Sequence, residues 1–281
     1  MPTLQFDSYT SAGAFYATTG AFMMQHEVAN NVPIGLLLNA IRAGDSARYR
    51  MWRVRSGETI VGAAMLSERG LILIVPLEGA AAPLAEHLHR EGVAIPEIVG
   101  TPSDCRAFVN TWEALTGQRA VLELPQFLYR LDNVIPVHGV AGRLRRGSTA
   151  EAALLVEWAN LFYTEAFGAN THAHAEDYVS ELLDAAEPRG IWVWEVDGKP
   201  VSTASVNRIT PHGAVISLVY TPPAERRKGC AAALTAALSA HLLTSGRQWC
   251  ALYTDQTNAT SNHIYQSIGY IRIGEQDDWV F

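Results

Sequence analysis

The segment YTPPAERRKGCAAALTAAL, residues 220–238, joins an apolar strand-like run to an alanine-rich helical run. Just before the predicted helix stand three cations, Arg226, Arg227 and Lys228. The start of a helix is already positive because of the helix dipole, and its unpaired backbone N–H groups attract anions. Gly229 lets the backbone approach a ligand closely, since it has no side chain. The segment therefore predicts a site for a ligand that carries several phosphate charges.

The loop differs from two common phosphate-binding loops. It matches neither GxxxxGK[ST] of nucleoside triphosphatases nor GxGxxG of dinucleotide-binding folds. Its order is a strand, then R-x-x-G-x-A at Arg226, Gly229 and Ala231, then a helix. This order resembles the pyrophosphate loop of the Gcn5-related N-acetyltransferase (GNAT) superfamily. The superfamily usually has glycine at the second loop position, where this chain has Arg227.

A second motif follows the loop. The pattern N-x-x-S-x-x-x-Y-x-x-x-G-Y is met by Asn258, Ser261, Tyr265, Gly269 and Tyr270. It resembles the closing segment of the same superfamily, and the two motifs stand in the expected order. The resemblance covers about residues 139–281 with specific motifs, and residues 1–132 by layout alone.

The resemblance implies acyl transfer from acetyl-coenzyme A to an amine. It implies that the strand AVISLVY, residues 214–220, splays at its end and pairs through its backbone with the pantetheine arm, at Leu218, Val219 and Tyr220. A backbone N–H of Val219 or Tyr220 would stabilise the negative charge that develops on the thioester oxygen. The expected coenzyme loop consists of Arg226, Arg227, Lys228, Gly229, Cys230 and Ala231.

Tyr265 stands where the family commonly has a general acid that protonates the departing thiolate. A phenol has a pKa near 10, so it is protonated at neutral pH and can donate. The alternative is a core aromatic, since Ile264 and Ile268 flank it. Asn258 either contacts the coenzyme arm or forms a turn. Ser261 is expected to cap the helix that follows it.

The general base stays open. Glu165 and Glu195 are candidate carboxylates, but both are more typical of ordinary surface groups, and a water chain to bulk solvent is an equal alternative. Ser217, on the central strand, is no base by itself. Cys230 is expected to be a small buried side chain rather than a nucleophile.

The chain contains two similar halves. Residues 51–76 and 191–222 each read as three strands with glycine turns, and each passes into a helical run, at 80–90 and 229–244. In both halves a later short helix is closed by glycine, Gly117 or Gly269. We expect an α/β fold of two tandem GNAT-like units, each a mixed, mostly antiparallel twisted sheet flanked by helices.

The predicted domains are residues 1–135 and 136–281, joined near residues 133–147, where hydrophobic periodicity is lost. The second domain is expected to bind the coenzyme. The first has LEGAAAPLAEH, residues 77–87, in place of the basic loop, and is expected to be degenerate.

Composition narrows the class of function. The chain has 281 residues, 48% of them hydrophobic, and a net charge of -7, which disfavours a nucleic-acid surface. The N-terminal sequence and the lack of an 18-residue apolar window predict no signal peptide and no membrane partner. Three dispersed cysteines indicate a reducing cytoplasm. His172 and His174 lack a third ligand at metal-binding spacing, so no metal is expected.

The sequence thus predicts a cytoplasmic N-acetyltransferase that uses acetyl-coenzyme A directly on an amine of a small molecule or peptide. A homodimer is compatible with this function, but the acceptor and the oligomeric state are not determined by the sequence. The alternative is a coenzyme-A-binding sensor or scaffold that has lost turnover.

Overall fold

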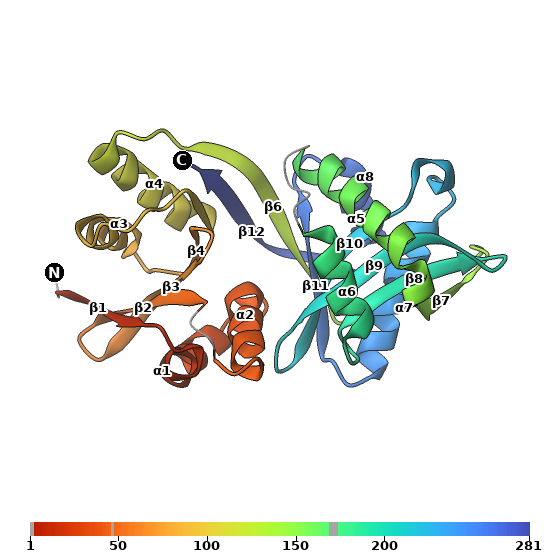
Figure 1. Cartoon of the computed structure of the whole chain (residues 1–281), viewed down its shortest axis with the longest axis horizontal. Helices are drawn as coiled ribbons and strands as arrows, with labels where there is room; N and C mark the ends of the chain where they lie inside the picture. The colour runs from red at the N-terminus through yellow and green to blue at the C-terminus, as the bar shows by residue number, and fades with distance from the viewer. Residues whose placement is uncertain (1–2, 46–47, 169–173) are drawn as a thin grey trace. The chain divides into compact units, whose positions relative to one another are not determined.

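The computed structural model describes residues 3–45, 48–168 and 174–281. Its elements occur twice in the same order (Figure 1). The first series is β1 (Leu4–Tyr9), α1 (Ala12–Met24), α2 (Asn31–Arg42), β2 (Tyr49–Ser56), β3 (Thr59–Ser67), β4 (Leu71–Val75), α3 (Ala81–Arg90), β5 (Glu97–Gly100), α4 (Pro102–Thr116) and β6 (Val121–Leu131). The second is β7 (Arg143–Arg146), α5 (Ala152–Phe167), α6 (Ala175–Asp184), β8 (Gly190–Val196), β9 (Lys199–Ile209), β10 (Gly213–Tyr220), α7 (Cys230–Thr244), β11 (Trp249–Asp255), α8 (Ala259–Ser267) and β12 (Ile271–Val280). The repeat confirms the predicted tandem α/β architecture.

The compact units divide at different residues from the predicted domains. One unit comprises residues 1–126 together with 274–281, and the other comprises residues 127–273. The last eight residues join the first unit because the end of β12 pairs with β5, with Asp277 opposite Gly100 and Val280 opposite Glu97. The predicted linker also contains a strand, since β7 pairs antiparallel with β8. Pairing register, which is not visible in local sequence, decides both points.

In the first unit the strand order is β1-β2-β3-β4-β5-β12-β6. The pairs from β1 to β4 and the pair β5–β12 are antiparallel, whereas β4–β5 is parallel. Side chains of β3 alternate between two cores, as a pleated strand requires. Ala63 and Met65 pack with α1 and α2, and Ala64 and Leu66 pack with α3 and α4. The sheet of this unit is therefore covered by helices on both faces.

In the second unit the strands run in the order β6-β11-β10-β9-β8-β7, with the end of β6 contributing. The pairs from β7 to β10 are antiparallel and β10–β11 is parallel, which repeats the first unit. Ile191 and Val193 face α5 and α6, while Trp192 and Trp194 face α7 (Figure 1). The two faces of this sheet therefore pack against different helices.

Two local predictions, the hairpin turn and the glycine after a helix, are met by the backbone. The turn between β8 and β9 has positive φ at Asp197 (48°) and Gly198 (76°), as a tight hairpin turn requires. Gly117 follows α4 in the left-handed conformation. The three cysteines are free and buried. In the described ranges, helices that combine the length and the apolar character needed to cross a bilayer are not found.

We predict that Gly213→Ala destabilises the second unit by about 1–3 kcal/mol. Gly213 pairs with Trp249 where β10 and β11 run together, and a Cβ atom at Gly213 would lie 2.2 Å from the indole Cε2. Gly274→Ala is the matched control, because a Cβ at that strand position meets nothing within 4 Å. Urea denaturation of both variants measures the difference, and equal stability would contradict the packing argument.

Candidate functional site

The end of β10 departs from regular strand geometry. Its pairing with β9 shifts register between Ser217 and Tyr220, so that two residues on β10 oppose one on β9. This is a β-bulge, and Leu218 within it has a φ of 49°, in the left-handed region that a leucine rarely adopts. Strain of this kind costs about 1–3 kcal/mol and is found at functional sites.

The bulge coincides with a splay between two parallel strands. β10 pairs with β11 at Gly213, Ala214 and Val215 only. Beyond Val215 the strands part, so the backbone of the last five residues of β10 has no ladder partner on that side. The splay predicted for the end of the strand 214–220 is therefore present over residues 216–220, which include Leu218, Val219 and Tyr220.

The loop after β10 leads directly into α7. Gly229, with a φ of 81°, is the N-cap of α7, and no side chain caps the helix. The first backbone bond of the helix runs from the Ala233 N–H to the Gly229 carbonyl. From residue 227 to residue 232, no backbone N–H donates a hydrogen bond to any part of the chain that the structure describes. A row of free amides thus stands at the start of the helix, where the dipole is positive.

The cations of the loop are partly balanced within the chain. Arg226 donates from Nη2 to both carboxylate oxygens of Glu165, at 2.7 and 2.8 Å, and this pairing raises the pKa of the guanidinium. Lys228 pairs with Glu225 at 2.8 Å. Arg227 is exposed and forms no ion pair or hydrogen bond with the described residues. The sequence-based view, in which only a ligand offsets these charges, is therefore incomplete.

Tyr265 lies on α8 within the core cluster that faces α7. The same cluster contains Cys230 of the loop, and Val219 of β10 packs against it. The end of β10, the loop before α7 and α8 therefore meet in one core. Tyr265 is 7% exposed, and burial raises the pKa of its phenol well above the ordinary value. Its ring contacts Tyr129 and Tyr270 at centroid distances of 6.5 and 6.0 Å.

The α8 N-terminus corrects one prediction. Ser261 is not the cap, because Asn258 occupies the N-cap position and its Oδ1 accepts the Ser261 N–H at 3.0 Å. Asn262, which sequence reasoning missed, is nearly buried and donates to the carbonyls of Asp255 and Gln256. Its Oδ1 accepts the Tyr129 hydroxyl at 3.1 Å. These amides hold the turn between β11 and α8.

Neither candidate base is available as a free carboxylate. Glu165 is paired with Arg226, as described above. Glu195 accepts from Arg143 and Arg145, whose hydrogen bonds lower its pKa. The thiol of Cys230 is 5% exposed and burial raises its pKa, in agreement with a packing role.

On the α5 and α6 face, a network of hydroxyls lies beside the bulge. Tyr178 Oη is 2.7 Å from Ser205 Oγ and 3.3 Å from Ser217 Oγ, and the two serine oxygens are 3.0 Å apart. Of these residues the sequence singled out Ser217 alone. The others come from α6 and β9, and only folding brings them together.

Residues 153–270 match the family model described as Acetyltransferase (GNAT) family. The match begins in α5 and includes the bulge, the loop with free amides, α7, and α8 with Tyr265. Residues 153–270 form a GNAT domain.

Solved GNAT structures resemble the whole chain. An acetyltransferase of the GNAT family from Colwellia psychrerythraea is 12% identical, with a TM-score of 0.60 and 98% of both chains covered. A GCN5-related N-acetyltransferase from Sphaerobacter thermophilus is 12% identical, with a TM-score of 0.65, and covers 98% of this chain and 94% of its own. A tandem GNAT protein from the clavulanic acid biosynthesis pathway is 16% identical, with a TM-score of 0.58, over 99% and 98%. At these identities the likeness is one of fold. No curated protein matches the sequence.

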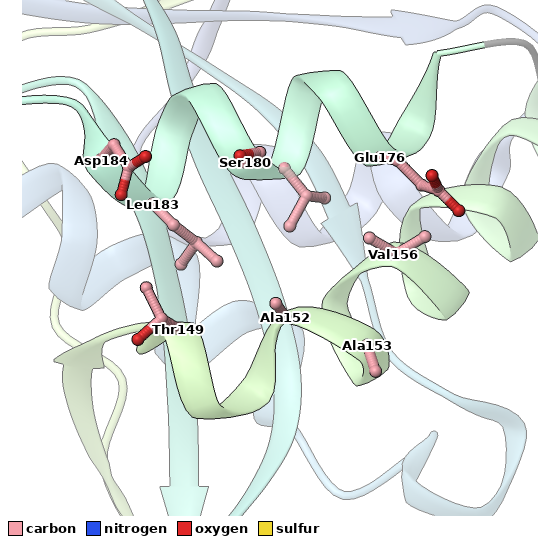
Figure 2. Close-up of a pocket in the computed structure, with 9 residues that line it drawn as sticks. Thr149, Ala152, Ala153, Val156, Glu176, Ser180, Leu183 and Asp184 are labelled. Atoms are coloured by element: carbon pink, nitrogen blue, oxygen red, sulfur yellow. The ribbon is translucent and has the colours of Figure 1, made fainter.

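A surface pocket of about 530 Å³ lies between α5 and α6 of this GNAT unit (Figure 2). Its polar wall carries the carboxylates of Glu176 and Asp184, at opposite ends of α6 in the view, and its floor is formed by apolar side chains such as Val156 and Leu183. Its lining contains no arginine or lysine. This composition does not suit a diphosphate, so the pocket is separate from the candidate coenzyme loop.

The sequence predicts that His172 and His174 bind no metal, and the structure describes only one of these two histidines. His172 lies outside the described residues, and His174 precedes α6. Groups of three or more His, Cys, Asp or Glu side chains that could hold a metal ion are not found in the ranges 3–45, 48–168 and 174–281.

The loop of this GNAT unit yields a test of backbone strain. Arg227 has a φ of 64°, which explains why glycine suits the second loop position in the superfamily. We predict that Arg227→Gly is more stable than Arg227→Ala by about 1 kcal/mol, because both lose the same charge and only glycine relieves the strain. Urea denaturation of the two variants measures this, and an alanine variant of equal stability would show that the left-handed conformation is not maintained.

A second prediction concerns the α8 cap. Asn258→Ala should lower stability by about 1 kcal/mol, because it removes the oxygen that accepts the Ser261 N–H. Ser261→Ala should change stability by less than about 0.5 kcal/mol, because only its backbone takes part. Thermal unfolding distinguishes the two, and the reverse order would restore Ser261 as the capping residue.

Proposed function

We propose that the second unit binds acetyl-coenzyme A and transfers its acetyl group directly to an amine of a small molecule or peptide. The observation that carries this proposal is the row of backbone N–H groups, residues 227–232, which have no acceptor among the described residues at the start of α7. The helix start without a side-chain cap, and Arg227 without an ion pair to the described chain, give the same corner a positive potential.

The chain's own residues fit such a ligand. Gly229 has a φ of 81°, which residues with a side chain rarely adopt, and a Cβ atom there would lie 2.8 Å from Val140 Cγ2. Glycine therefore avoids both the backbone strain and the clash. Residues 226–231 would hold the diphosphate, and the unpaired backbone of Leu218, Val219 and Tyr220 would take the pantetheine arm as an added strand. Asn258 already serves as a helix cap, which favours the turn role over the coenzyme role.

Tyr265 is proposed as the general acid. In the transfer, the acyl carbon leaves sulfur and bonds to nitrogen, the amine loses a proton, and the thiolate gains one. Because burial raises the pKa of Tyr265, its phenol remains protonated at neutral pH and above, which is the form a proton donor needs. A backbone N–H at the bulge, from Val219 or Tyr220, would polarise the carbonyl. We assign no side-chain base.

The proposed partners are limited to the donor and an amine acceptor. A net charge of -7 argues against nucleic acid, and we propose no membrane partner and a cytoplasmic location. A homodimer remains a prediction. The first unit would not bind coenzyme, since its β3–β4 ladder has no register shift over Ala63–Leu66 and its loop contains Glu78.

The proposal is tested by two measurements on the full chain. Saturating coenzyme A should raise the melting temperature, since a ligand at about 100 times its dissociation constant adds about 2.7 kcal/mol. Thiol release from acetyl-coenzyme A should then depend on one or more members of an amine panel. Binding without amine-dependent release would favour a coenzyme sensor, and no shift in melting temperature would overturn the assignment of the loop.

Tyr265→Phe and Tyr270→Phe form a matched pair of predictions. The Tyr265 hydroxyl forms no hydrogen bond with the described residues, whereas the Tyr270 hydroxyl lies 2.9 Å from Ser239 Oγ in the same core. Tyr265→Phe should therefore keep stability and coenzyme affinity but lower kcat by about 100-fold or more. Tyr270→Phe should lower stability by about 1 kcal/mol and keep kcat. Full turnover by Tyr265→Phe would remove the acid role.

A further inference from the structure

Arg208 is a cation inside the second unit that the proposed chemistry does not use. It lies on β9 and pairs across the sheet with Val215, the last residue at which β10 also pairs with β11. The residue is only partly exposed, and its Nε atom is buried without a hydrogen-bond partner. Arginines are rarely buried in this way unless they are paired.

The surroundings of Arg208 contain aromatic hydroxyls rather than carboxylates. Its guanidinium carbon lies 5.9 Å from the centroid of the Tyr253 ring on β11. The other groups that act on its charge are Tyr163 on α5 and Tyr178 on α6. No ion pair joins Arg208 to the described part of the chain, whereas Arg145, Arg189 and Arg226 of the same unit all have carboxylate partners.

The position of this guanidinium is defined by three adjacent strands. To reach Tyr253 on β11, the side chain extends from β9 across β10, at the level where β10 and β11 part. Tyr178, which acts on Arg208, also lies within hydrogen-bond distance of Ser217, the residue before the bulge. Val215 and Ser217 are two residues apart on one strand, about 7 Å. The unpaired cation therefore lies beside the bulge, on the α5 and α6 face.

We propose that Arg208 binds a carboxylate group of the substrate in the acyl-transfer site. An inward-facing guanidinium offers a planar fork of donors that matches a carboxylate, and tyrosine hydroxyls can complete its hydrogen bonds. A carboxylate would also neutralise a partly buried charge that the described residues leave without a counter-ion. This inference rests on the proposed function. It predicts either an amine acceptor with a nearby carboxylate, such as an amino acid, or an acyl group that ends in one.

The experiment compares matched substrates on the full chain. In the first comparison, acetyl-coenzyme A is the donor, and each of a set of L-amino acids is compared with its carboxamide as the acceptor. In the second comparison, the carboxamides are the acceptors, and succinyl-coenzyme A is compared with acetyl-coenzyme A as the donor. The wild type should prefer the carboxylate member of one comparison by about 100-fold in kcat/KM, the size expected for a partly buried charge-assisted contact. The comparison that shows the preference identifies which substrate carries the carboxylate.

Arg208→Met should reduce the carboxylate preference to nearly onefold, and should change the rate with uncharged substrates by no more than a few-fold. Arg208→Lys should retain part of the carboxylate preference. Arg189→Met is the control, because Arg189 bonds Glu181 at 2.5 Å and should not affect the preference. No preference in the wild type, or an unchanged preference in Arg208→Met, would overturn the proposal.

Stability separates a binding role from a structural one. Because Arg208 lacks a partner in the described chain, Arg208→Met should raise the melting temperature of the ligand-free protein. A lower melting temperature would indicate that the guanidinium holds the fold together, and would count against the proposal. Coenzyme A should shift the melting temperature of wild type and Arg208→Met alike, so failure of donor binding is recognised independently of the carboxylate result.

Discussion

Two residues of β10, Leu218 and Val219, stand opposite one residue of β9, and the chemistry that we propose for the second unit depends on that mismatch. Strand side chains alternate between faces, so an extra residue reverses the alternation after it. Before the bulge Ile216 packs toward α7, and after it Leu218 and Tyr220 pack toward α5 and α6. Pairing with β11 ends before the bulge, at Val215, where the register with β9 also shifts between Val215 and Ile216. The backbone of residues 216–220 is thereby left without a ladder partner on the β11 side.

The first unit has the same fold without a bulge at the corresponding strand, β4. It repeats the element order and the parallel pair of strands, yet β3 and β4 pair without a register shift over their described residues. The loop after β4 is also occupied, since the Leu77 N–H donates to the Asp104 carboxylate at 3.3 Å. Both units bury a sheet between helices. Burial of a sheet between helices is thus common to both units, whereas the bulge at the end of β10 has no counterpart in the described β3–β4 pairing.

The sequence predicts the layers well, because their signals are local. Apolar alternation marks the strands, glycine closes α4 and follows α8, and the Asp197-Gly198 turn marks a hairpin. The bulge was not foreseen in detail, because leucine at a φ of 49° opposes residue preference and is imposed by tertiary packing. Pairing between distant residues was also not predictable. Arg226 meets Glu165 across 61 positions, and the end of β12 joins the first unit through register with β5.

The hydroxyls of the buried tyrosines in the core that faces α7 differ in their hydrogen bonding. Tyr129 and Tyr270 bond through their hydroxyls to Asn262 and Ser239, while Tyr265, in the same cluster, has no such bond to the described chain. On the opposite face of the sheet, the Nε atom of Arg208 is buried and has no hydrogen-bond partner among the described residues. Tyr265 belongs to the core that faces α7, which Val219 contacts, whereas Arg208 pairs with Val215, the last residue at which β10 pairs with β11. A phenol that keeps its proton and a guanidinium without a counter-ion in the described chain are explained together if a thioester and a carboxylate-bearing substrate meet where β10 and β11 part.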